Sequence, residues 1–312
     1  PATFVCLLEV DNLEASQMRL VPRWGSLNIP LALITFLLPK ADGGISGLKS
    51  WFSGAFPNAT SKLETGVCET FDHVCFDMNE ILHTSLRRAN NEDHAIKRIF
   101  KEVNRVLRFC QPTKSIVFAF DGSAPLAKLM VQRSRRASTA KHSRYLMSPL
   151  HLTPGTDFME RVAKAMEYYA FQCIQDNYRY SHVRFYISGA SVPGEGELKC
   201  IDWVKLSMLP GTEESTVIVG GDADLILQGL ALSKVKNLFI FDLVQGYKGQ
   251  LVSLWEVVRS LEATFPGQSE HMRADLLLLL VLNGNDYLPK VRGMSFKRCY
   301  KAYLRTLLKN GK

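Results

Sequence analysis

Acidic residues follow most of the short apolar runs in this sequence. Six carboxylates share this position, directly after a run or in the turn that leaves it: Asp77, Asp121, Glu195, Glu197, Asp222 and Asp224. Asp286, in "NGNDYLP", follows the apolar helical pattern "LLLLLVL" and is a seventh candidate. A single DxD or ExE pair most often consists of solvated acids in a loop. Repetition after successive apolar runs favours a shared site instead.

Carboxylates packed this closely repel one another and raise each other's pKa values unless a divalent cation neutralises them. Oxygen ligands in this number select Mg²⁺ or Mn²⁺ over zinc. Two such ions a few ångströms apart activate water and stabilise the leaving oxygen in phosphodiester hydrolysis. The acids therefore predict a two-metal hydrolytic centre.

A basic segment follows Asp121 directly. Residues 122–156 carry six lysines and arginines and no acid, in a chain whose net charge is +8. Pro125 is expected to open a helix, and i, i+4, i+7 and i+8 spacing places four side chains on one face of it. These are Lys128, Gln132, Arg135 and Arg136. Such a face suits a phosphate, although a solvated basic face or a localisation signal remains open from this segment alone.

The elements that must position these groups alternate between short β-rich runs and longer helical patterns. The predicted strands are residues 73–78, 115–120, 183–188, 215–221 and 237–243. The predicted helices are residues 92–109, 124–145, 156–177, 194–208, 252–264, 271–283 and 294–309. This alternation predicts an α/β fold with a twisted, mostly parallel central sheet and helices on both faces. Ligands bind beyond the carboxyl ends of such strands, so the acids are expected to converge at one edge.

Composition sets wider limits. A length of 312 residues suits one large α/β domain, and 46% hydrophobic with 22% charged residues indicates a folded chain. The net charge favours an anionic partner such as nucleic acid. The seven cysteines never show CxxC spacing, which argues against a disulfide framework or a zinc site and favours a reducing compartment. The apolar run at residues 27–38 is too short to span a membrane, and it fits a signal-like segment or a buried element.

Several blocks of the chain resemble the XRN-type 5′→3′ exoribonucleases, relatives of the flap endonucleases with a PIN-like fold. They are "GISGLKSWF", "FDMNEILH", "AFDGSAPLAKLMVQRSRR", "VPGEGELK", "GGDADLILQGLA" and "NGNDYLP". They fall in family order between residues 44 and 290.

The resemblance implies roles at matching positions. All seven acids match the metal ligands of the family, and Lys128, Gln132, Arg135 and Arg136 match its pocket for a 5′-terminal monophosphate. His83 matches a histidine that stacks on the terminal nucleotide, although alone it would be read as an ordinary helix or loop residue. Lys199 is expected to support the acids, to contact a substrate phosphate or to form a plain ion pair.

The chain also departs from the family pattern. Members usually begin at the glycine equivalent to Gly44 and continue into a second conserved region, which is not found within these 312 residues. Residues 1–42 are therefore expected to form an N-terminal extension that is either a targeting segment or disordered. Residues 43–312 are expected to form the XRN-like nuclease domain. A protein partner is a candidate for replacing the second region. The family implies a nuclear or cytoplasmic location, the apolar run leaves an organelle open, and a membrane partner is not expected.

The function that these residues predict is metal-dependent removal of nucleotides from the 5′ end of 5′-monophosphorylated single-stranded RNA. Two alternatives stay open. One is a structure-specific nuclease that acts on DNA flaps, and the other is a non-catalytic or weakly active RNA-binding scaffold in a ribonucleoprotein.

Overall fold

One twisted sheet with helices on both faces organises the chain. The computed structural model describes residues 48–142, 146–176, 180–208, 212–232, 236–244, 248–285, 287–288 and 290–309. The described strands join in the order β1-β7-β6-β5-β2-β3-β4. Their bounds are Thr60–Leu63 (β1), Glu69–Asp77 (β2), Cys110–Ala119 (β3), Arg184–Ser188 (β4), Thr216–Val219 (β5), Leu238–Val244 (β6) and Lys248–Ser253 (β7). Strands β2 to β6 run parallel, whereas β7 runs antiparallel to both β6 and β1.

The five predicted strands are confirmed, as is the mostly parallel α/β sheet. Strands β1 and β7 were missed. Both are short and carry polar residues, so neither shows a β-rich apolar run. Strand β1 lies at the edge of the sheet, where this is usual, and β7 lies next to it.

Helices separate the strands along the chain. The longer ones are Glu92–Val106 (α3), Leu126–His142 (α4), Asp157–Asp176 (α5), Gly196–Ser207 (α6), Leu254–Thr264 (α8), Ser269–Leu282 (α9) and Phe296–Lys309 (α10). All seven were predicted, with ends displaced by a few residues. The prediction missed Leu48–Ala55 (α1), Met78–Arg87 (α2), Asp224–Leu230 (α7) and the 3₁₀ turns Pro57–Ala59 and Pro149–Leu152. No helix in the described ranges is both long and apolar enough to cross a bilayer.

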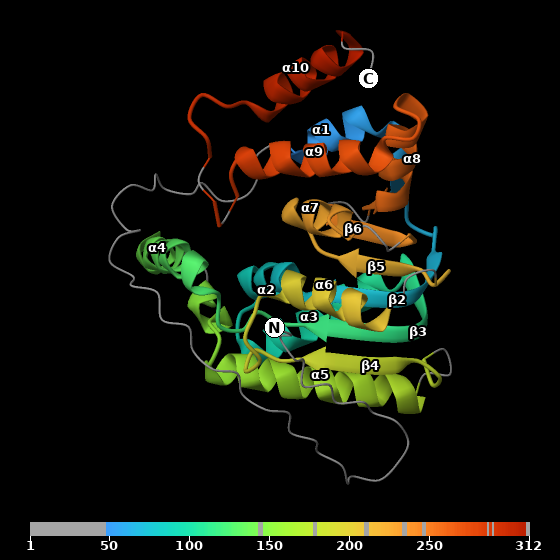
Figure 1. Ribbon diagram of the computed structural model, residues 1–312. Coiled ribbons are helices and arrows are strands. Elements are labelled where there is room, and N and C mark those ends of the chain that lie inside the picture. Colours follow the sequence, from blue (N-terminus) through green and yellow to red (C-terminus); the bar gives the residue numbers. More distant parts are fainter. Residues whose placement is uncertain are drawn as a thin grey trace, which may run out of the picture.

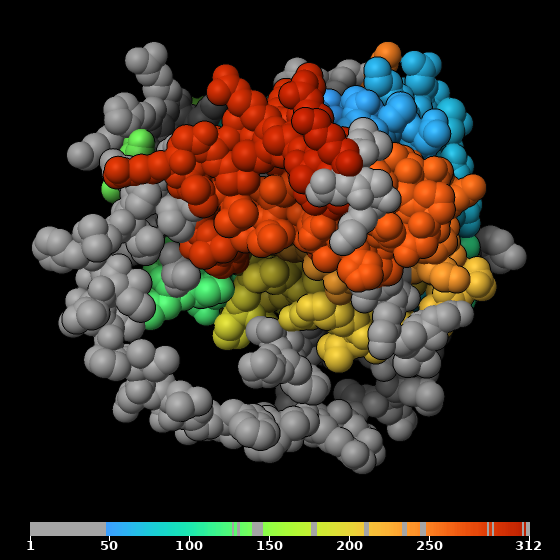
Figure 2. Space-filling view, turned by 45° about the horizontal axis from the view of Figure 1, so that its top comes forward, coloured from blue at the N-terminus to red at the C-terminus, as the bar shows by residue number. Residues whose placement is uncertain are grey.

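Alternation along the strands divides the core into two layers, because successive side chains point to opposite faces. Val74 and Phe76 pack with α2, α3 and α5 on one face. Cys75, between them, packs on the other face with α1, α6, α7, α8, α9 and α10. Figure 1 shows α5 along β4 at one side of the molecule and α1, α9 and α10 stacked at the opposite side. In Figure 2, α10 lies over α9 and beside α1.

Strand order places the site. The chain builds outward from β2 to β3 and β4 in one direction and from β5 to β6 in the other, so β2 and β5 flank a switch point in the topology. Ligands bind at such points, outside the carboxyl ends of the strands. Figure 1 shows α4 beside this end of the sheet, toward which β3, β4 and β5 point. The acids after β2 and β5 therefore face each other across the crevice.

Candidate active site at the carboxyl edge of the sheet

The structure brings six of the seven predicted acids to this edge of the sheet. Asp77 is the last residue of β2, and its Oδ1 accepts a hydrogen bond from the Asn79 backbone N–H at 3.1 Å, which caps α2. Asp121 follows β3, Glu195 and Glu197 begin α6, and Asp222 and Asp224 begin α7. Asp286 lies outside the described residues, as do residues 1–42 and Gly44.

Gly196 is the point where three of these elements meet. Its backbone N–H donates to Asp121 Oδ1 at 2.7 Å. A Cβ at this position would lie 2.5 Å from Asp77 Oδ1 and 2.9 Å from the Ala119 carbonyl oxygen. The glycine between Glu195 and Glu197 therefore allows α6 to approach β2 and β3 closely enough to gather carboxylates from all three.

The assembled site concentrates negative charge. Burial raises the pKa of Asp77 to about 8, helped by repulsion from Asp121 and Asp222. Burial likewise raises the pKa of Glu197 to about 8, with Asp222 and Asp77 adding to the effect. Burial and Glu195 raise the pKa of Asp121, against an opposing hydrogen bond from Gly196. The pKa values of Asp77, Asp121 and Glu197 are thus raised by burial and by neighbouring carboxylates, as is expected where carboxylates share a site.

This donor set fits a divalent cation by its chemistry. The ligands are hard carboxylate oxygens, and their mutual repulsion is the energy that a bound cation would remove. As the side chains lie here, no three His, Cys, Asp or Glu residues of the described part converge on one ion-sized position. The carboxylates therefore share an edge without yet forming a closed chelating group.

Two side chains of the predicted basic face of α4 reach the acids. Lys128 Nζ lies 2.8 Å from Glu195 Oε1, with the two side chains only 11% and 4% exposed. Gln132 donates to the same oxygen at 3.5 Å, and Arg136 donates to Gln132 Oε1 at 3.1 Å. Arg135 is exposed on the same helix. A chain of contacts thus leads from the acid cluster outward along α4.

Lys199 supports the site from below. Its ammonium, 2% exposed, donates to the Phe120 carbonyl at 2.7 Å and to the Gly189 carbonyl at 3.0 Å. Burial lowers its pKa to about 8, while Asp121 opposes the shift. Of the three expected roles, its contacts match support of the acids, because it fixes the ends of β3 and β4 that carry the turns into the site.

His83 lies on α2, half-buried, six residues after Asp77. Burial lowers the pKa of its imidazole, and Arg87 adds to the shift. The lowered pKa favours the neutral ring, which offers an aromatic face rather than a charge.

Two further residues touch the predicted acids, a third lies close to the site, and all three were missed from sequence. The Tyr287 hydroxyl donates to Glu195 Oε2, and Lys128 lies 5.4 Å from the centre of its ring. Gln228 donates to Glu197 Oε1 at 3.0 Å. Glu80 lies so close to Gly221 that a Cβ there would be 2.3 Å from its carboxylate. Weak signals existed: Gln228 follows Asp224 by one helical turn, and Tyr287 stands next to Asp286 in the "NGNDYLP" block.

Comparison with known proteins matches this arrangement to a family. A family model described as the XRN 5′-3′ exonuclease N-terminus matches residues 43–151 and 145–242. The 5′-3′ exoribonuclease 1 of Schizosaccharomyces pombe is 28% identical in an alignment 302 positions long that covers 80% of this chain and 22% of that protein. The 5′-3′ exoribonuclease 2 homolog of Drosophila melanogaster is 31% identical in an alignment 244 positions long that covers 67% of this chain and 26% of that protein. The chain thus spans about a quarter of the length of these relatives.

Among solved structures, the catalytic core of Rad2 in complex with a DNA substrate is similar with a TM-score of 0.46 at 16% identity. That similarity covers 81% of this chain and 66% of the other. A similarity of this size says nothing about substrate.

Proposed function

This chain belongs to the XRN 5′-3′ exonuclease family, whose N-terminal region it matches. We propose that it is a 5′→3′ exoribonuclease that hydrolyses 5′-monophosphorylated single-stranded RNA to nucleoside monophosphates. The observation that carries the proposal is the contact of Lys128 with Glu195. It joins a basic face suited to a terminal phosphate to a cluster of carboxylates suited to divalent cations.

The cations would be two Mg²⁺ or Mn²⁺ ions. The residues proposed to hold them are Asp77, Asp121, Glu195, Glu197, Asp222, Asp224 and Asp286. Such ions supply a water activated for attack and stabilise the charge on the leaving oxygen, so the reaction needs no covalent intermediate.

The residues of the chain would bind and orient the RNA. The forked guanidinium groups of Arg135 and Arg136 suit a terminal phosphate dianion, and Lys128 would exchange its contact with Glu195 for the same phosphate. A 5′-hydroxyl end would leave these cations without a partner. The neutral imidazole of His83 would stack on the terminal base, as histidine does in RNA recognition.

A time course with 3′-labelled single-stranded RNA tests this function. Two RNAs of one sequence, with a 5′-monophosphate or a 5′-hydroxyl, are incubated with Mg²⁺ or with a chelator, beside a 5′-phosphorylated DNA of the same sequence. We expect metal-dependent loss of the monophosphorylated RNA alone. Faster loss of the DNA would favour the flap-type nuclease, and RNA binding without cleavage would favour the scaffold.

Asp222→Asn is the matched inactive control. Asp222 is exposed, so the substitution is expected to leave folding unchanged while removing a charge from the centre. Full activity in this variant would remove Asp222 from the proposed ligand set.

A further inference from the structure

A second feature opens from the same acidic edge. A cavity of about 690 Å³ lies between α2, α3 and the ends of β5 and β6, and its lining includes Asp77 and Gly220. Its size falls within the range of about 300–1,000 Å³ typical of ligand sites. We call it the α2–α3 groove. It lies on the sheet face that α2, α3 and α5 cover, away from α6 and α7.

The groove gathers cations. Its lining includes six, all from α2, α3 and the turns that follow them: Arg87, Arg88, Arg98, Lys101, Arg105 and Arg108. Its acids are Asp77, Glu80 and Glu102. Only Arg105 among the six has an ion pair within the described part of the chain, with Glu102 at 3.2 Å. Arg87 also lies close enough to Glu80 to favour its charged form. With six cations against three carboxylates in its lining, the groove keeps an excess of positive charge.

Arg98 is only partly exposed, and its Nε is out of contact with solvent and has no hydrogen-bond partner among the described residues. Arg87, Arg88, Lys101 and Arg108 are exposed and line the same concavity.

The apolar residues of the lining form the floor of the groove. Ile81, Val106 and Val219 are 7%, 0% and 4% exposed, so the surface that the groove offers to a ligand is mainly that of its cations. A positively charged groove of this kind can follow the backbone of single-stranded nucleic acid, with successive phosphates on successive cations.

The site residues fall in a spatial order. Lys128 of α4 contacts Glu195, Gly196 then lies between Asp121 and Asp77, and Asp77 in turn lines the α2–α3 groove. A strand whose 5′ phosphate is held on α4 and whose first phosphodiester lies over the acids therefore continues into the groove.

We propose that the α2–α3 groove binds the RNA strand on the 3′ side of the scissile phosphate. The assignment of direction rests on the proposed exoribonuclease function, whereas binding of a single strand in the groove can be measured without it.

Charge reversal of two exposed groove residues tests the proposal. The variant is R88E/K101E, since both side chains are exposed and carry no ion pair within the described residues, so the fold does not depend on them. The matched control is K97E/K164E, which makes the same change in charge at exposed positions outside the groove. Binding of a long 5′-phosphorylated oligoadenylate is measured by fluorescence anisotropy over a salt series, with chelator present so that no RNA is consumed.

We expect R88E/K101E to bind the long RNA at least about tenfold more weakly than the control variant, and the slope of log affinity against log salt to fall by about 2. In steady-state hydrolysis, kcat/KM is expected to fall further for the long RNA than for a 5′-phosphorylated dinucleotide, which is too short to enter the groove.

Equal affinity and equal salt slope in the two variants would overturn the proposal. A second result would also overturn it. If R88E/K101E were no longer inhibited by adenosine monophosphate but bound the long RNA as before, the groove would bind the reaction product and not the RNA strand. If the unmodified chain hydrolyses no RNA, the proposed function fails, and the anisotropy comparison still decides whether the groove binds a strand.

Discussion

The site depends most closely on residues that have no functional group. Gly196 has no side chain, yet its position between Asp77 and Asp121 sets how near the carboxylates of α6 come to those of β2 and β3. Gly220, beside Asp77, leaves room for α7 instead, since a Cβ there would lie 2.4 Å from Leu225 Cδ1. The chemistry of the acids therefore rests on backbone that can approach them.

Gly196→Ala is expected to reduce hydrolysis and to destabilise the fold by about 1–3 kcal/mol, the usual cost of overpacking. The new methyl group would meet the Ala119 carbonyl at 2.9 Å, and backbone cannot swing away as a side chain end can. Urea unfolding and RNA turnover measure the two effects. Gly54→Ala is the control, because a Cβ there has nothing within 4 Å. Unchanged activity and stability in Gly196→Ala would contradict the close approach described here.

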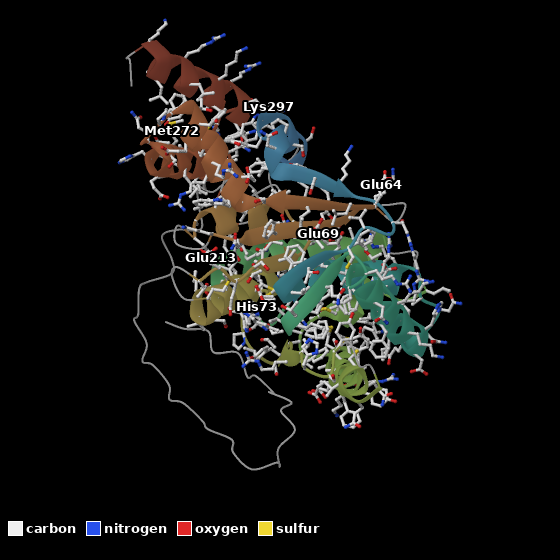
Figure 3. All side chains as sticks on the ribbon, turned by 90° about the vertical axis from the view of Figure 1, so that its right-hand side faces the viewer. Glu64, Glu69, His73, Glu213, Met272 and Lys297 are labelled. Carbon is white, nitrogen blue, oxygen red and sulfur yellow. The ribbon has the colours of Figure 1, made fainter. Side chains whose placement is uncertain are left out.

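At the scale of elements, α4 contacts the acids at the carboxyl ends of the parallel strands, whereas other polar residues connect the strands at their amino-terminal ends. Helix α4 begins at Leu126 and presents Lys128 and Gln132 to the acids, which leaves Arg135 and Arg136 further along the same helix. The opposite edge of the sheet holds the strands together through polar contacts. Figure 3 labels Glu69, His73 and Glu213 at that edge.

Arg135→Ala together with Arg136→Ala is expected to remove most of the preference for 5′-monophosphate over 5′-hydroxyl RNA, because the guanidinium groups proposed to bind the terminal phosphate are gone. The ratio of kcat/KM for the two RNAs measures it. Arg133→Ala, an exposed arginine of the same helix outside the predicted face, serves as control. A preserved ratio in the double variant would remove the phosphate pocket from α4.

Asp72 joins β2, β3 and β5 at the amino-terminal edge. It accepts hydrogen bonds from the Ser215 backbone at 2.9 Å and from the Thr113 hydroxyl at 3.1 Å. Burial acts to raise its pKa, but these bonds and Lys114 outweigh burial, so the pKa lies below its ordinary value of 3.8. A carboxylate with a lowered pKa stabilises the fold above its ordinary pKa and loses that contribution as pH falls through the lowered value.

Asp72→Asn is accordingly expected to lower the free energy of unfolding at neutral pH, with the gap to the unmodified protein narrowing as pH falls below 3.8. Urea unfolding over a pH series measures the gap. Glu69→Gln, at an exposed position of the same strand, is expected to show no such change. A gap that is constant with pH would show that Asp72 acts by its shape rather than its charge.

At the scale of the whole molecule, the first and last helices of the described part, α1 and α10, pack against each other. Trp51 of α1 packs edge-on against Phe296 and Tyr300 of α10, with ring centres 4.6 Å and 5.1 Å apart. In Figure 3, Lys297 at the start of α10 lies beside α1. These rings belong to the apolar layer that α1 and α6 to α10 form on one face of the sheet, so segments far apart in sequence complete that layer.

Phe296→Ala is expected to destabilise the protein by about 3–5 kcal/mol, since it removes a buried ring from this cluster. Thermal unfolding followed by circular dichroism measures the change. Leu278→Ala, at a position 55% exposed on α9, is expected to stay within about 0.5 kcal/mol of the unmodified protein. Equal effects of the two substitutions would mean that α10 contributes nothing to the fold.

The sequence by itself determined the five parallel strands, seven of the helices and the acids that follow the strands, because period-2 and helical patterns are local and strand ends in a parallel sheet meet at one edge. It also determined the basic face of α4, which follows from helical spacing alone.

Only the tertiary structure decided the rest. The strands β1 and β7 form because a partner strand lies beside each of them, and neither shows this in its own residues. The contacts of Tyr287 and Gln228 with the acids, and the groove of α2 and α3, arise where segments distant in sequence approach each other. Those distances are set by packing across the sheet, which no local pattern of residues records.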